Sequence, residues 1–363
     1  MWSRPQVLDD AVDAAEAELP LARHAAPTRL MVLGGAGLLG PLAGWLEPLV
    51  AATGQGRGFA YDEVEAVEAL VDAFRAWRGT GLSRAAVTGQ VADLADRLRD
   101  APGGSRTDRV YLATAHLSKI AGSMAFDAGT HRAAQRHYIT AVRLAKAGGD
   151  LGFGAVTLAA LARVQYDAGA PDDGLAVIHL ATRGSRDHTT PRLVSMLAVR
   201  EAWGHARRGD FARFHAAADV ARAAHPGDSD DGEPSALAGF DTAELHGTLG
   251  ARLRDLATRD PRHGPAAIDH IESALRLRDP ARARCRAFDL VSLGRTHLIT
   301  RDGEAAAAPI RAALPHLDAS RPGRLFRKVR DWNREAAPLA GCTAVADTRA
   351  EIAELAAPTG RSV

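Results

Sequence analysis

The sequence contains very little cysteine, lysine and asparagine. Its two cysteines, Cys285 and Cys342, are too few and too far apart for a disulfide framework or a metal site. We therefore expect a protein of the reducing cytoplasm. Alanine, by contrast, is abundant among the 363 residues. Because alanine is the strongest helix former and lets helices approach closely, this composition favours closely packed helices.

An excess of charge of one sign is also lacking. The chain has 45 basic and 44 acidic residues, which gives a formal net charge of +1. This balance argues against a protein whose whole surface binds nucleic acid. One basic cluster does lie near the C-terminus, and we interpret it as the solvated face of a last helix. Its members are Arg321, Arg324, Arg327, Lys328, Arg330 and Arg334.

One apolar stretch, residues 30–52, is nearly long enough to span a membrane. However, Glu47 interrupts it, and Pro41, Pro48 and several glycines would break a continuous helix. A secretory signal would also need a basic segment close to the start of the chain. We therefore expect no membrane contact, and we predict one or two short helices buried against the rest of the protein.

The same stretch contains a glycine-rich loop. Gly35, Gly37 and Gly40 have the spacing G-x-G-x-x-G after a short apolar run, and Asp62 lies downstream. Such a loop binds pyrophosphate when a strand precedes it, a helix follows it and further strands alternate with helices. The residues after Tyr61 instead favour helices throughout. A nucleotide-binding enzyme is therefore a weak alternative, and no cofactor is expected.

The remainder of the chain has an internal repeat. Gly129, Gly169 and Gly209 lie 40 residues apart, each after a helical segment. Glycine at such a position ends one helix in a left-handed conformation before the next helix begins. The step therefore predicts a series of helix–turn–helix units.

Small and large residues recur at fixed positions within these units. A small residue at the crossing of two helices lets their axes approach, and a larger residue on the second helix fills the adjacent gap. The small residues are Gly122, Ala162, Ala202 and, in a fifth unit, Gly294. The corresponding second-helix residues are Tyr138, Ile178, Ala218 and Ile310. An alanine lies three residues after each of these second-helix residues.

The fourth unit is less regular than the others. It follows a polar loop, residues 225–234, and we predict its first helix over 235–257 and its second over 265–277. We take Gly247 as its small residue.

Several short sequence segments resemble those of a family of actinobacterial transcriptional regulators. They are residues 122–129 with 134–138, 240–245 and 277–282, and residues 33–45 resemble the linker of that family. In this family a tetratricopeptide-like C-terminal region follows an N-terminal helix-turn-helix domain of the phage-repressor type. The resemblance implies an all-α fold, a tetratricopeptide-like right-handed superhelix of about five to six helical hairpins.

This interpretation divides the chain into four parts. They are an N-terminal helical segment and linker (1–60), a first helical pair (61–106), the repeat array (107–355) and a tail (356–363).

The start of the sequence departs from the family. The segment before the linker has about half the length that a helix-turn-helix domain needs. Residues 9–19 can form one acidic helix, whose charge is wrong for phosphate contacts. We therefore do not expect direct DNA binding by this chain. The DNA-binding part is then lost, on another chain, or missing from a truncated start.

In tetratricopeptide superhelices the first helix of each unit lines the concave groove, and the resemblance implies which residues point into it. They are His116, Lys119, Ser123, Phe126 and Asp127 in the first unit, Arg163, Tyr166 and Asp167 in the second, Trp203 and Arg207 in the third, Asp241 and Glu244 in the fourth, and Arg295 in the fifth. Such a mixture of cations, aromatic rings and carboxylates suits a peptide or a small amphipathic signal.

Catalytic arrangements are lacking. The histidines are scattered without metal-ligand spacing, and no serine lies in an elbow motif. We therefore expect no enzyme and no metal site. The leading hypothesis is a regulatory protein that binds a peptide effector, a small-molecule effector or a protein partner in its groove and modulates transcription or development. The alternative is a constitutive protein–protein scaffold without a small ligand, and homodimer formation stays open.

Overall fold

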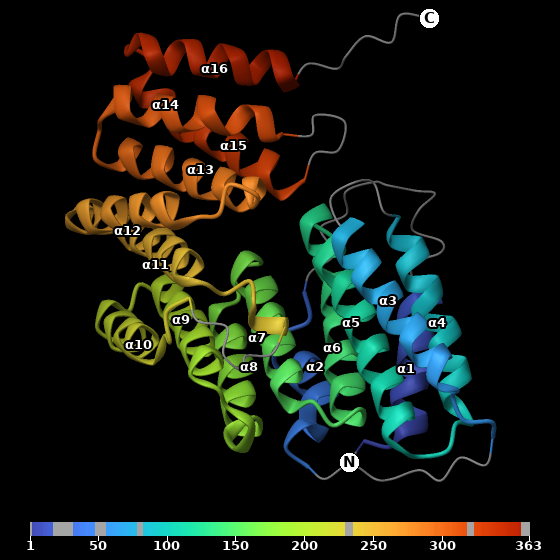
Figure 1. The fold of residues 1–363 in the computed structure, drawn as a ribbon. Coiled ribbons are helices and arrows are strands. Elements are labelled where there is room, and N and C mark those ends of the chain that lie inside the picture. Colours follow the sequence, from blue (N-terminus) through green and yellow to red (C-terminus); the bar gives the residue numbers. More distant parts are fainter. Residues whose placement is uncertain are drawn as a thin grey trace, which may run out of the picture. The chain divides into compact units, whose positions relative to one another are not determined.

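The computed structural model describes residues 2–16, 32–47, 56–77, 83–228, 235–317 and 323–356. Within these ranges the regular elements are α-helices and short 3-10 helices, without a strand, so the all-α prediction is confirmed (Figure 1). The α-helices are α1 (Arg4–Glu16), α2 (Gly35–Leu39), α3 (Tyr61–Trp77), α4 (Arg84–Arg99), α5 (Ser105–Ala128), α6 (His131–Ala147), α7 (Leu151–Asp167), α8 (Pro171–Gly184), α9 (Pro191–Arg208), α10 (Phe211–Ala224), α11 (Thr242–Ala257), α12 (Gly264–Leu277), α13 (Ala283–Ile299), α14 (Gly303–Ala313), α15 (Arg324–Glu335) and α16 (Thr343–Ala356). The 3-10 helices are η2 (Gly40–Leu46), η3 (Arg186–His188), η4 (Ser235–Leu237), η5 (Pro261–His263), η6 (Leu314–His316) and η7 (Ala337–Leu339). None of the helices in this part of the chain is long and apolar enough to cross a membrane.

The chain forms two compact units. Unit 1 comprises Met1–Arg200 with Pro234–Leu237, and unit 2 comprises Glu201–Glu233 with Ala238–Val363. The boundary falls within α9, so the N-terminal helices and the first repeat hairpins belong to the same unit. This division differs from the ranges expected from the sequence.

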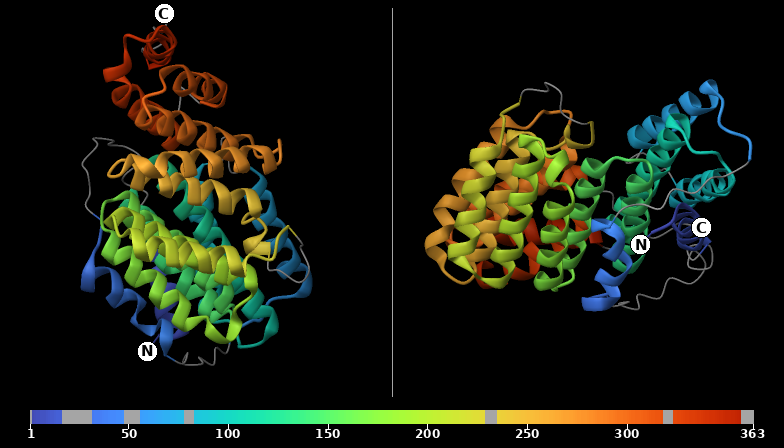
Figure 2. Two further views of the ribbon diagram at one scale, coloured as in Figure 1. Left: turned by 90° about the vertical axis from the view of Figure 1, so that its left-hand side faces the viewer. Right: turned by 90° about the horizontal axis from the view of Figure 1, so that it is seen from below.

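Unit 1 is built around two helical hairpins, α5–α6 and α7–α8, with α6 packed against α7 (Figure 2). Helices α3 and α4 both pack on α5, and α4 also packs on α1. The two helices of the region 61–106 are therefore placed by their contacts with α5 and α1. The N-terminal helix α1 contacts the first hairpin directly through α6.

The turn glycines have the conformation that the sequence predicts. Gly129, Gly169 and Gly209 have φ angles of 81°, 84° and 76°, in the left-handed region that favours glycine. The pairing of small and large residues is also observed. A Cβ atom on Gly122 would lie 2.9 Å from the ring of Tyr138, so only a residue without a side chain allows this helix crossing. The helix–turn–helix repeat is therefore confirmed in the first hairpins.

The apolar N-terminal stretch folds as predicted where it is described. It forms α2 and η2, and η2 packs on α6 and α8. Leu38 and Leu42 are fully buried, and Trp45 is nearly so. The ends of the predicted stretch, residues 30–31 and 48–52, lie outside the described residues.

The fourth unit differs from its prediction at two points. Its first helix, α11, begins at Thr242 instead of residue 235, because the side chain of Asp241 accepts a hydrogen bond from the Glu244 N–H (2.7 Å) and caps the helix there. Its small residue is Gly250 instead of Gly247. A Cβ atom on Gly250 would lie 2.6 Å from the Ile271 side chain, which reproduces the pairing of Gly122 with Tyr138.

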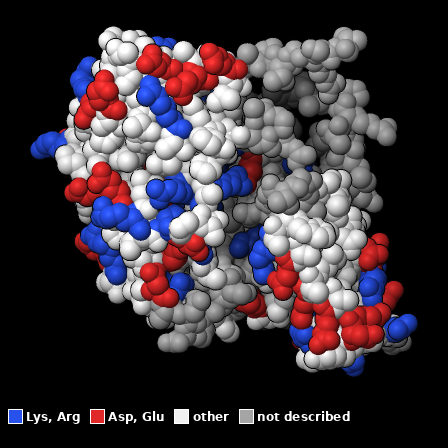
Figure 3. Space-filling model, turned by 45° about the horizontal axis from the view of Figure 1, so that its top comes forward, with Lys and Arg blue, Asp and Glu red and all other residues white. Residues whose placement is uncertain are grey.

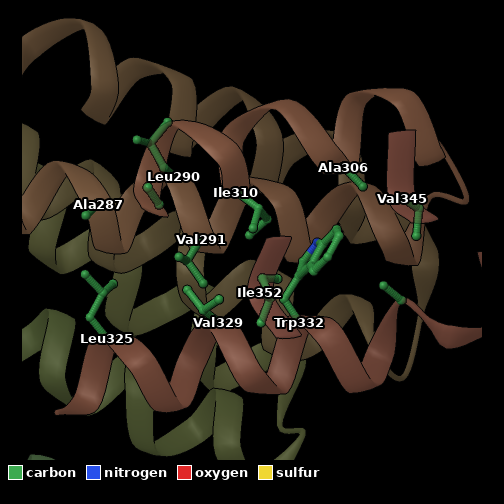
Figure 4. Close-up of a cluster of buried hydrophobic side chains, with 12 residues drawn as sticks. Ala287, Leu290, Val291, Ala306, Ile310, Leu325, Val329, Trp332, Val345 and Ile352 are labelled. Atoms are coloured by element: carbon green, nitrogen blue, oxygen red, sulfur yellow. The ribbon is translucent and has the colours of Figure 1, made fainter. Parts of the chain in front are cut away.

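Unit 2 has a hydrophobic core between α13, α14, α15 and α16 (Figure 4). Leu325, Val329 and Trp332 repeat at helical spacing along α15 and direct one side of that helix into the core. The basic residues of α15 therefore lie on its other sides. The sequence interpretation placed the basic cluster on a last helix. In the structure α15 is not the last helix, because α16 follows and packs against it. Of the predicted basic cluster, Arg321 lies outside the described residues.

Candidate functional site

The corrected register of the fourth unit places two further residues at offsets that the sequence interpretation assigned to the predicted groove. With Gly250 as the small residue, the fourth and fifth positions after it are Arg254 and Asp255. These correspond to Phe126 and Asp127 after Gly122. In the structure both lie in one electrostatic cluster with three predicted residues of unit 2, namely Trp203, Arg207 and Arg295.

Arg252 connects the aromatic ring of α9 to the carboxylate of α11. Its guanidinium carbon lies 3.9 Å from the centroid of the Trp203 ring, a cation–π arrangement. Its Nη1 lies 2.9 Å from Oδ2 of Asp255. Arg254 approaches the other oxygen of the same carboxylate, at 2.6 Å. The Asp255 side chain is only 14% exposed, so it is held between two arginines inside unit 2.

The cluster continues onto α13 and α15. Arg254 donates a hydrogen bond to the Ser292 hydroxyl at 3.2 Å. Arg295 binds both oxygens of Glu335, through Nε at 2.8 Å and Nη2 at 2.5 Å. We call this set of residues the arginine face. It consists of Trp203, Arg207, Arg252, Arg254, Asp255, Ser292, Arg295 and Glu335.

The arginine face has four arginines and two carboxylates, whereas the whole chain is almost neutral. Burial opposes ionisation of Asp255, but the charges of Arg252 and Arg254 outweigh it and hold its pKa below the ordinary value. Burial likewise acts to lower the pKa of Arg295, but its hydrogen bonds to Glu335 outweigh this and raise it. Burial lowers the pKa of Arg254, and the charge of Asp255 opposes this change. On the face that Figure 3 shows, Lys and Arg side chains lie beside Asp and Glu side chains in several places.

A further arginine fixes the end of α9. Arg259, which follows α11, donates to the backbone oxygens of Ala206 at 3.1 Å and Arg207 at 3.2 Å. These carbonyls belong to the last turn of α9, where a cation is stabilised by the helix dipole. The contact fixes the backbone at Arg207, whose side chain is exposed.

The predicted residues Asp241 and Glu244 belong to a different cluster. Glu244 lies 3.0 Å from Arg278, which also binds Asp289 at 2.8 Å, and Asp241 lies 3.0 Å from Arg282. The side chain of Arg278 is 1% exposed. These two carboxylates therefore connect α11 to the segment after α12. The segments 240–245 and 277–282, two of those on which the family resemblance rests, are thus in direct contact.

In unit 1, His116 and Lys119 lie together beside an aromatic ring of α7. The His116 and Phe153 ring centroids are 4.0 Å apart, and Nζ of Lys119 lies 5.2 Å from the Phe153 centroid. Nη2 of Arg75 lies 3.3 Å from Nδ1 of His116. Burial lowers the pKa of His116 to about 3, with smaller contributions from Lys119 and Arg75, so the imidazole is neutral at physiological pH.

A second group of predicted residues meets at the turn between α5 and α6. Arg163 lies over the Phe126 ring, 5.4 Å from its centroid. His131 Nε2 is 3.2 Å from Asp167. Asp127 is half-buried at the end of α5. The pairs Arg163–Phe126 and His131–Asp167 connect the end of α5 and the start of α6 to α7.

Two predicted residues face a second helix instead of an open surface. The Ser123 hydroxyl lies 3.1 Å from the Tyr138 hydroxyl, on the side of α5 that meets α6. Tyr166 is fully buried against Gly174 of α8. Ser123 lies one residue after its small residue and Tyr166 four residues after its own, so the offset from the small residue alone does not tell which side chains face the second helix.

The glycine-rich loop does not have the geometry of a nucleotide-binding loop. The Leu33 N–H donates to the Gln135 side chain, and the Gly35 N–H donates to a carboxylate oxygen of Asp173, both at 2.8 Å. A carboxylate therefore occupies the backbone donor that a phosphate would need. Helix α2 has five residues, and no strand precedes it in the described residues.

The part of the chain that the structure describes contains no group of three or more His, Cys, Asp or Glu side chains that could hold a metal ion. No family model matches the chain, and no curated protein or solved structure matches it. The arginine face is therefore interpreted from its own chemistry.

Proposed function

We propose that this chain is a regulatory, tetratricopeptide-like protein that binds a peptide or a segment of a protein partner on the arginine face of unit 2. The observation that carries this proposal is the excess of arginine over carboxylate on neighbouring helices α9, α11 and α13. In the proposed architecture these first helices line the concave side of a right-handed superhelix. Their side chains would then face a bound segment together.

The physical basis is the strength of charge-assisted hydrogen bonds in a partly buried site. Arg254 and Arg295 are 8% and 14% exposed, so water screens their charges weakly. The guanidinium group offers a fixed fork of donors that matches a carboxylate or phosphate oxygen pair. Trp203 adds an aromatic surface of the kind that is enriched in binding sites.

A regulatory role follows if binding changes the stability of unit 2. A segment bound across α9, α11 and α13 would stabilise their packing by mass action. We expect a ligand that acts in this way to raise the unfolding temperature of the protein. A constitutive scaffold would also bind protein, but it would respond to no free peptide.

Selection from a random peptide library against the full chain tests the proposal. Arg207→Glu reverses a charge on the exposed end of α9, and Arg208→Glu makes the same change at the next exposed residue. Successive residues of a helix point about 100° apart, so the second variant is a matched control. We expect selected peptides to lose about tenfold in affinity with Arg207→Glu, a loss of about 1.4 kcal/mol, and little with Arg208→Glu.

The proposal is wrong if no peptide is enriched, or if the enriched peptides respond equally to both variants. Equal responses would indicate general charge attraction instead of a site on unit 2.

A further inference from the structure

The two carboxylates of the arginine face are held very differently. Asp255 is 14% exposed and contacts both Arg252 and Arg254. Glu335 is 37% exposed and is held by the fork of Arg295. If a buried carboxylate between two arginines leaves, the charges of both arginines stay buried without compensation, whereas a half-exposed carboxylate can return to water. Glu335 is therefore the exchangeable carboxylate of this face.

The position of Glu335 on its helix supports the same conclusion. Glu335 is the last residue of α15, where the partial negative charge of the helix dipole disfavours a carboxylate. Its ion pair with Arg295 offsets this unfavourable placement. Trp332, three residues earlier, is fully buried in the core that Figure 4 shows, and it anchors α15 independently of Glu335. The carboxylate can therefore leave Arg295 while the helix stays packed.

We propose that the fork of Arg295 is a carboxylate-binding subsite that Glu335 occupies within the same chain, and that the ligand is an acidic peptide segment whose side-chain carboxylate takes its place. This inference rests on the proposed function, since it names the chemistry of the ligand at the same face. Glu335 then acts as a built-in competitor that sets a threshold for binding.

A peptide carboxylate suits this face better than a nucleic acid does. In the structure these arginines bind carboxylates, Arg252 and Arg254 through one nitrogen each at Asp255 and Arg295 through its fork at Glu335. Asp255 stays in place beside Arg254 and would repel a continuous row of phosphates. Separate glutamate or aspartate side chains along a peptide can instead contact single arginines and leave Asp255 undisturbed.

The test measures fluorescence anisotropy of a labelled peptide of alternating glutamate and alanine, added to the full chain at low salt. The same peptide with glutamine in place of glutamate is the control probe. Glu335→Gln removes the competing charge, and we expect about threefold tighter binding. Arg295→Gln removes the subsite, and we expect at least about tenfold weaker binding.

Glu351→Gln is the matched control variant. Glu351 is 45% exposed and lies 3.2 Å from Nε of Arg311, so it is a comparable ion pair outside the arginine face. We expect the affinity of this variant to equal that of the unchanged protein. Far-ultraviolet circular dichroism of each variant verifies that the helices are retained.

Unchanged or weaker binding in Glu335→Gln overturns the inference, as does equal tightening in Glu351→Gln. Tighter binding of a single-stranded oligonucleotide than of the acidic peptide, with the same response to Arg295→Gln, assigns the face to nucleic acid and also overturns it. If the acidic peptide does not bind while a neutral library peptide shows the expected loss with Arg207→Glu, this inference fails and the proposed function stands.

Discussion

Units 1 and 2 satisfy their buried polar side chains in different ways. In unit 1, Gln135, Lys146 and Gln165 are buried, and each donates to backbone oxygens of residues 33–47, far away in the sequence. In unit 2, Arg278 is buried and pairs with the carboxylates of Glu244 and Asp289. These three side chains of unit 1 thus attach a segment, whereas Arg278 joins elements of unit 2 through charge.

This difference shows where a charged ligand can compete. A backbone carbonyl is neutral and fixed in its segment, so it does not exchange with a carboxylate from solution. In an ion pair between side chains, a carboxylate of a ligand can replace the carboxylate of the protein when that side chain is partly exposed to water. Unit 2 contains such a pair on the arginine face, and the predictions below test whether the two kinds of contact differ in energy.

The largest effect is expected for Arg278→Met in unit 2. Removing one partner of a buried ion pair leaves the other charge without compensation, and such changes cost roughly 3–5 kcal/mol. Burial and the neighbouring Glu244 raise the pKa of Asp289 to about 7, opposed by Arg278, so Asp289 can take up a proton and limit the loss. We therefore expect the free energy of unfolding in urea to fall by about 3 kcal/mol. Arg262→Met removes an exposed ion pair with Asp260, and this variant should keep the free energy of unfolding unchanged.

A smaller effect is expected for Lys146→Met in unit 1. The Lys146 ammonium donates to the carbonyls of Gly44, Trp45 (2.9 Å) and Glu47, at the end of η2. Methionine keeps the length of the side chain but leaves these neutral acceptors without their donor, which costs about 2 kcal/mol. Urea unfolding monitored by tryptophan fluorescence measures the change. A loss as large as that of Arg278→Met would remove the energetic distinction between the units.

The smallest effect concerns the pH dependence of unit 1. The pKa of His116 is lowered to about 3 in the folded protein, against 6.5 without burial, so the unfolded chain takes up the proton first. The stabilisation from the neutral imidazole is present above pH 6.5 and is lost as the pH falls towards 3. Between pH 7 and pH 5.5 the protein should lose about 1 kcal/mol through this group. His116→Gln should remove this contribution of the histidine. The free energy of unfolding in urea, measured at the two pH values, should then fall less in the variant than in the unchanged protein.

Unit 2 should show a different pH profile from unit 1. His270, with its pKa lowered to about 4 mainly by burial, behaves like His116. Asp289 has the opposite sign, because its pKa is raised, so its contribution declines as the pH rises from about 4 towards 7. Asp289→Asn should therefore make the variant more acid-sensitive than the unchanged protein. Equal slopes in the two proteins would contradict the assigned burial of Asp289.

Much of the fold was predictable because the repeat is regular where its turns are short. Helices α5 and α6 are separated by Gly129 and Thr130, and the glycine turn fixes their register. In the fourth unit, by contrast, η5 lies between α11 and α12. This longer connection increases the offset between the small residue and its larger partner from 16 residues (Gly122 to Tyr138) to 21 (Gly250 to Ile271), so the fixed spacing could not identify Gly250.

The arginine face was predictable only in part, for the same reason. Trp203, Arg207 and Arg295 follow their small residues at the expected offsets. Arg254 was missed because the register of its unit was wrong. Glu335 lies on α15, beyond the last recognised repeat, so no periodic signal in the sequence connects it to Arg295.

The contact at Leu33 has a consequence for how this protein can vary. Gln135 both accepts from the Leu33 N–H and donates to its carbonyl, and Gln165 donates to the same carbonyl at 2.8 Å. Both glutamines bind the peptide group and leave the side chain of residue 33 out of the contact. This anchor therefore constrains the side chains at positions 135 and 165, while at position 33 its hydrogen bonds exclude only proline, which has no N–H.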